Sequence, residues 1–152
     1  MGAVNFTTFW TNLETLEKAI AISSPVALKV KRAYWGAPQQ EIADLPCIIN
    51  ALSETDRTLG FGSRDQNLRI NVQLLVASAT VEDTYNALKA TSFWFAAKDA
   101  FDEDITIGST VSFSTLRGAD PTRSGYPDPR RTGLYGFNAY LDVQDVEDFT
   151  FG

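Results

Sequence analysis

The chain has 152 residues, of which 44% are apolar and 21% are charged, and its formal net charge is −6. This length and composition predict one folded domain, residues 1–152, and exclude the low-hydrophobicity, high-charge class of disordered proteins. The negative charge argues against broad non-specific binding to nucleic acid, because lysine and arginine supply most of that affinity by neutralising phosphates.

No membrane span or export signal is predicted. The longest apolar run, Phe93 to Ala97, is far shorter than the roughly 20 residues that a membrane-spanning helix needs. The first residues, MGAVNFTTFW, lack a basic segment followed by an apolar stretch and a small-residue cleavage site. We therefore expect a soluble protein that is made in the cytoplasm.

The first predicted element is an amphipathic helix between Phe6 and Ile22. Its apolar residues recur at intervals of three and four, which is the spacing of one helix face. The segment Ser23 to Pro25 ends the helix, and alternating residues from Leu28 to Trp35 then predict a strand, followed by a turn at GAPQQ. The apolar positions of the helix face are Phe6, Phe9, Leu13, Leu16 and Ile20.

Two strands are predicted on either side of a polar segment. The apolar run Leu45 to Leu52 predicts the first strand, and the strict alternation from Leu68 to Val76 predicts the second, with one buried face. Residues 53–67, SETDRTLGFGSRDQN, are polar and contain glycine, so we expect a long loop. Its two arginines, Arg57 and Arg64, each have an aspartate next to them.

A second helix of about five turns is predicted after Thr80, which suits an N-terminal cap. Two strands follow, Ile105 to Leu116 with a break near Gly108, and Leu134 to Val146. The helix face expected to pack on the sheet consists of Val81, Tyr85, Leu88, Ser92 and Phe95, widened by Phe93, Trp94 and Phe101.

The order of these elements predicts the fold class. Strands in runs, with helices set apart, favour an α+β domain over strict βαβ alternation. We therefore expect a mostly antiparallel sheet, two helices packed on one of its faces, and long loops that project at about 53–67 and 117–133.

The residue inventory excludes much catalytic chemistry. Histidine is absent, which removes the commonest general base, the commonest metal ligand and every Ser–His or Cys–His nucleophile pair. The single cysteine, Cys47, excludes an internal disulfide and a cysteine-based zinc site, and its apolar surroundings predict a small buried side chain. We predict neither an enzyme nor a bound cofactor.

The densest acidic cluster consists of Asp99, Asp102, Glu103 and Asp104. Paired carboxylates could act in catalysis or bind a divalent ion, and acidic side chains at the end of a helix are unfavourable for its dipole. The cluster lacks the spaced oxygen ligands and central glycine of an EF-hand loop. We interpret it as a solvated turn, with a metal site as the competing hypothesis.

The segment RGADPTRSGYPDPRRTGLYG, residues 117–136, is the most unusual part of the chain. It carries four arginines and two aspartates, a local charge of +2, and three of the six prolines. Connections longer than about 12–15 residues are uncommon in compact domains unless they are functional. A loop without a role and a nucleic-acid-binding segment both stay possible, whereas a catalytic lid would have no site to cover.

We favour an arm that binds another protein. Prolines lower the entropy lost on docking, and arginine and tyrosine are enriched at protein interfaces. The candidate interface residues are Arg117, Arg123, Tyr126, Arg130 and Arg131 of this segment, together with Arg57 and Arg64 of the 53–67 loop.

From about Phe6 to Asp148, the chain presents in order the helix FTTFWTNLETLEKAIAI, the strand LPCIINAL, a long polar loop, the strand LRINVQLLVAS, the helix TVEDTYNALKATSFWFAAKDAF and the strand GLYGFNAYLDVQDV. In element order and texture, rather than in a signature motif, this resembles the tail terminator (tail completion) proteins of long-tailed bacteriophages and their neck-region relatives.

The resemblance implies a sheet with two helices on one side, and six copies in a ring that ends the tail tube and joins it to the head connector. It implies no catalytic residues. The implied partners are further copies of the chain, the tail tube protein, the connector or stopper protein of the neck, and DNA that passes without sequence-specific binding. The implied location is the virion neck, after assembly in the host cytoplasm. Another neck or head-completion protein is the alternative within this class.

Overall fold

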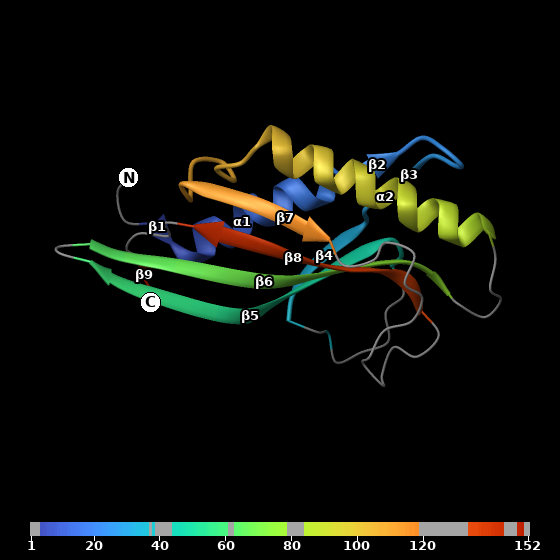
Figure 1. Ribbon diagram of the computed structural model, residues 1–152. Coiled ribbons are helices and arrows are strands. Elements are labelled where there is room, and N and C mark those ends of the chain that lie inside the picture. The colour runs from blue at the N-terminus through green and yellow to red at the C-terminus, as the bar shows by residue number, and fades with distance from the viewer. Residues whose placement is uncertain are drawn as a thin grey trace.

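The computed structural model (Figure 1) describes residues 4–36, 38, 44–60, 63–78, 84–118, 134–144 and 149–150. The elements within these residues are, in chain order, β1 (Val4–Asn5), α1 (Phe6–Lys18), β2 (Ala21–Ile22), β3 (Leu28–Lys29), β4 (Arg32–Trp35), β5 (Cys47–Gly60), β6 (Ser63–Ser78), α2 (Thr84–Glu103), β7 (Phe113–Gly118), β8 (Leu134–Gln144) and β9 (Phe149–Thr150).

A five-stranded sheet organises the fold. Its strand order is β4-β5-β6-β8-β7, so that β4 and β7 are the two edges. The β4–β5 pair is parallel and the other three pairs are antiparallel. Two further short sheets have two strands each: β1 pairs with β9 in parallel, and β2 pairs with β3 in antiparallel orientation. The predicted α+β class with a mostly antiparallel sheet is confirmed.

The two helices cover one face of this sheet and share one core with it (Figure 1). Alternate residues of β6 and β8 point into that core because side chains alternate between the faces of a strand. Burial of each large apolar side chain stabilises the fold by about 1.5–3 kcal/mol. The core includes Phe9 and Leu13 of α1, Ala90, Phe93, Ala97 and Phe101 of α2, Ile70, Val72 and Leu74 of β6, and Phe137, Leu141 and Val143 of β8.

The packing face predicted for the second helix is wrong at Tyr85, Leu88 and Phe95, whereas Phe93 and Phe101, which were predicted to widen it, are buried. Tyr85, Leu88 and Phe95 are 42%, 51% and 62% exposed, whereas the buried face carries alanines and phenylalanines at intervals of three and four. Apolar residues occupy more than one face of α2, so their spacing allows two stripes. The small side chains of Ala90 and Ala97 let the helix lie close to the sheet, and that stripe is buried.

The loop predicted at residues 53–67 is also wrong. β5 and β6 continue through this segment as one long antiparallel hairpin, and their register extends to Gly60 opposite Ser63. The pairing of β6 with β8 begins only at Leu68, so the end of the hairpin extends beyond the five-stranded sheet (Figure 1). A ribbon of two strands has no face that must be apolar, and the sequence therefore lacks the alternation that predicts a strand.

Three other predicted elements differ in their bounds, and the first is the helix predicted between Phe6 and Ile22, which ends at Lys18. The segment from Leu28 to Trp35 is divided between β3 and β4, and only Phe113–Gly118 of the strand predicted at 105–116 is a strand. Residues before it form turns, in which Gly108 has a φ of 63° and its N–H donates to the Asp104 carboxylate. The predicted cap at Thr80 lies outside the described residues.

The core-facing side of α1 carries a buried acid. Glu17 is fully buried, and its Oε1 accepts a hydrogen bond of 2.7 Å from Nδ2 of Asn50 on β5. The second oxygen of Glu17 and Oδ1 of Asn50 are buried without a partner. Burial raises the pKa of Glu17 to about 8. The hydrogen bond from Asn50 lowers this pKa by a smaller amount, and the nearby charge of Glu14 raises it slightly. Glu17 is therefore neutral at pH 7, and a neutral carboxyl has a hydroxyl that can donate.

Candidate assembly surface

The structure describes three of the predicted interface residues. Arg117 lies on the edge strand β7, and its side chain is 64% exposed. Arg57 and Arg64 lie on the part of the β5–β6 hairpin beyond the five-stranded sheet, and not on the predicted loop. The other candidates lie outside the described residues and stay predictions: Arg123, Tyr126, Arg130 and Arg131.

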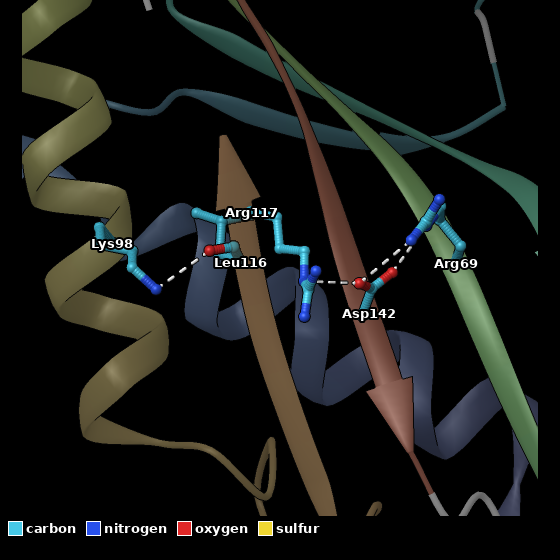
Figure 2. A network of polar contacts seen from close by, with 5 residues as sticks. All are labelled: Arg69, Lys98, Leu116, Arg117 and Asp142. Atoms are coloured by element: carbon cyan, nitrogen blue, oxygen red, sulfur yellow. Dashed lines mark hydrogen bonds and ion pairs between the residues drawn. The ribbon is translucent and has the colours of Figure 1, made fainter. Parts of the chain in front are cut away.

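Arg117 belongs to a polar network on the sheet face opposite the helices. Its Nε lies 2.9 Å from Oδ2 of Asp142 on β8. Nε of Arg69 on β6 lies 2.8 Å from Oδ1 of the same carboxylate, and Arg69 Nη2 lies 3.4 Å from Oδ2 (Figure 2). The Arg69 guanidinium also lies 5.4 Å from the centre of the Tyr140 ring. One carboxylate thus connects three neighbouring strands.

Strand register explains this network. Arg69 is directly opposite Asp142, which in turn is opposite Thr115 of β7. Arg117 is opposite Tyr140 and reaches Asp142 diagonally, a separation that long side chains can span. Two guanidinium groups share a carboxylate that is 18% exposed, so the network has an excess of positive charge.

The sequence did not single out Arg69 or Asp142 as site residues. Both lie at the polar positions of alternating strands, which predicts a solvent-facing side chain and gives no partner. The signal was an arginine and an aspartate on two strands of the same sheet. Only the β6–β8 register shows that they are opposite each other.

We expect the substitution Asp142→Asn to destabilise the fold by about 1–2 kcal/mol, because it removes the charge from hydrogen bonds made by two arginines. Arg117→Gln should cost less, since the Arg117 side chain is 64% exposed and its ion pair is screened by water. Urea unfolding measures both values. Equal, negligible effects of the two substitutions would contradict a structural role for the network.

On the outer side of the helical layer, α2 presents a second candidate contact surface. The exposed apolar side chains Tyr85, Leu88 and Phe95 lie along its outward face, and Lys89 Nζ lies 4.4 Å from the centre of the Tyr85 ring. Several large apolar side chains on one exposed helix face are typical of a surface that contacts another macromolecule.

The acidic cluster at the end of α2 is exposed. Asp99, Asp102 and Glu103 are open to solvent, and Asp102 lies 3.3 Å from Lys98 Nζ. Asp104 instead accepts hydrogen bonds from the N–H of Gly108 within its own turn. Among the described residues, no group of three or more potential ligands is arranged to hold a metal ion. In the same part of the chain, no helix is long and apolar enough to cross a membrane.

Comparison of the chain with models of protein families and with curated proteins gives no match. The functional conclusion therefore depends on the fold and on the surfaces described above.

Proposed function

We propose that the protein is a structural virion protein, without catalytic activity, that forms a ring ending the tail tube of a long-tailed phage and joining it to the head connector. The observation that supports this proposal is the arrangement of the fold. Two helices lie on one face of a mostly antiparallel sheet, in the order that the sequence resemblance implies, and a long hairpin extends past the sheet.

The hairpin supports assembly on physical grounds. An isolated two-stranded hairpin is marginally stable in water, and three or more strands or a packed helix normally stabilise it. The part between Thr55 and Asn67 pairs only with itself within the described residues. In a ring, a neighbouring subunit or the tail tube would cover it.

The sheet edges and the net charge fit the same arrangement. The edges β4 and β7 are strands of four and six residues, and edge strands are commonly covered in assemblies. A net charge of −6 suits a ring through which DNA passes, because a negative lumen repels phosphates and lets the DNA slide.

Imaging of the purified protein mixed with tail tubes tests the proposal. A terminator should bind at one end of each tube and leave the shaft bare. Binding to isolated connectors with no binding to tubes would instead favour a neck or head-completion protein. Binding to neither would contradict both assignments.

Charge reversal in the arginine-rich segment has a predicted outcome. We expect Arg130→Glu combined with Arg131→Glu to leave folding intact and to abolish incorporation into tails, because the arm would no longer match its partner. Circular dichroism tests folding, and the yield of complete particles tests assembly. An unchanged yield would show that the segment has no role in assembly.

A further inference from the structure

A basic groove follows the β4 edge of the sheet. Two adjoining hollows of about 410 and 330 Å³ share Glu14 and Lys18 of α1 in their walls. Arg32 lies on β4 itself, and its Nη1 is 3.5 Å from Oδ2 of Asp44. We define the basic groove by its four exposed cations, Lys18, Lys29, Lys31 and Arg32, which outnumber its two carboxylates, Glu14 and Asp44.

The acidic end of α2 lies beside the opposite edge of the sheet. Lys98 Nζ donates to the carbonyl oxygen of Leu116 on β7 over 3.0 Å, which joins the last turns of α2 to that edge strand (Figure 2). Asp99, Asp102 and Glu103 project from these turns into solvent. We define these three carboxylates as the acidic helix end.

One molecule therefore carries opposite charges at its two sheet edges. Strands lie about 4.8 Å apart, so the edges of a five-stranded sheet are separated by about 20 Å. The two charged surfaces are too far apart to neutralise each other fully within one chain, because screening in physiological salt acts over about 8 Å. Both surfaces remain available to a second molecule.

We propose that the basic groove of one copy binds the acidic helix end of the next copy, so that the β4 edge of each subunit faces the β7 edge of its neighbour. Such a contact joins two different surfaces, and head-to-tail contacts of this kind generate rings when the rotation closes. This inference rests on the proposed ring and specifies which residues of adjacent subunits meet.

Charge complementarity favours a second copy over DNA as the occupant of the groove. The net charge of −6 on the chain disfavours non-specific binding of DNA to the groove. The acidic helix end offers three carboxylates for the four cations, and it is present on every copy at equal concentration. A neighbouring helix end would also form ion pairs that steer association.

A charge-swap experiment tests this contact. The groove variant carries Lys29→Glu and Lys31→Glu, and the helix variant carries Asp99→Lys and Glu103→Lys. All four side chains are exposed, and none has an ion-pair partner among the described contacts. The yield of rings, alone and on tail tubes, is measured by mass photometry and imaging, and circular dichroism tests folding.

We expect each variant to lower the ring yield at least about tenfold, because like charges would then face each other across every interface. Mixing the two variants should restore rings, since subunits of the two kinds can alternate with all contacts complementary. The chain that carries all four substitutions should also form rings. Ser23→Glu, at an exposed position outside both charged surfaces, serves as the control that leaves the yield unchanged.

The outcomes separate this contact from the proposed function. Wild-type rings together with undiminished rings from both variants would overturn the contact and leave the proposed function standing. The contact would also be overturned if each variant loses its rings and neither mixing the two variants nor combining all four substitutions restores them. If the groove variant forms rings but retains less duplex DNA, the groove contacts DNA and the inference is wrong. No wild-type ring in either condition would overturn the proposed function together with the contact.

Discussion

The free energy of unfolding is expected to fall as the pH rises from about 4.5 to about 8, because of Glu17. Its pKa is about 8 in the folded protein and 4.5 in the unfolded chain, so the folded state binds more protons within this window. The contribution of Glu17 is complete below pH 4.5 and is lost as the pH passes 8. The total change is on the order of 5 kcal/mol, since each pH unit between the two pKa values corresponds to about 1.4 kcal/mol.

The substitution Glu17→Gln isolates this effect. The amide is neutral at every pH, and it can accept from and donate to the amide of Asn50. We expect the variant to be more stable than the wild type above pH 8, and its stability to change much less between pH 5 and 8. Urea unfolding at a series of pH values gives the difference between the two proteins, which cancels the contributions of all other groups.

Glu14→Gln on the same helix is the matched control. Glu14 makes only the smallest contribution to the raised pKa of Glu17, so this variant should retain most of the pH dependence. Parallel curves for the wild type and Glu17→Gln across the whole range would show that Glu17 is not buried as a neutral acid.

The second large effect is expected at Gly136. A Cβ atom at this position would overlap the carbonyl oxygen of Leu74 on the neighbouring strand and would also lie 2.8 Å from the carbonyl carbon. A backbone obstacle cannot rotate away, so β6 and β8 would have to separate where their register shifts between Leu75 and Ala77. We expect Gly136→Ala to destabilise the fold by roughly 3 kcal/mol or more.

Gly36→Ala separates this clash from the general cost of replacing glycine. Gly36 has a φ of 80°, and a Cβ there would meet nothing within 4 Å. The backbone strain alone should cost about 1–2 kcal/mol. Chemical unfolding compares the two variants, and equal losses of stability would contradict the close approach of Gly136 to β6.

Hydrophobic periodicity predicted the elements that bury one face. α1 and the central part of β6 each have a single apolar stripe, so the pattern gave both the type of element and its buried side. α2 has apolar residues on two faces, and the choice between them depends on the shape of the sheet surface. The sequence of the hairpin beyond Leu68 lacks the apolar alternation that marks a strand, and its pairing depends on register, which single-strand patterns do not contain.

The buried acid left a weak signal in the sequence. Glu17 follows Phe9 and Leu13 at intervals of four, which places it on the core side of α1. An acid on that side predicts a polar partner, and Asn50 is the single asparagine within the apolar run of β5. Their contact depends on how α1 crosses the sheet, which the sequence pattern does not specify.

The candidate interface was predictable only in part. The sequence marked Arg117 as a member of a projecting segment, but its ion pair with Asp142 depends on the registers of β7 and β8. The basic groove combines α1, β3 and β4 with residues near Asp44, and these segments are separated in the sequence. Charge complementarity between the two sheet edges follows from strand order and not from any local motif.

Counting the copies of the protein bound to tail tubes tests the central proposal most directly. Mass measurement, combined with imaging of the tube ends, should give six copies in a closed ring at one end of each tube. A protein that stays monomeric at high concentration and binds no tail tube would contradict the proposed function.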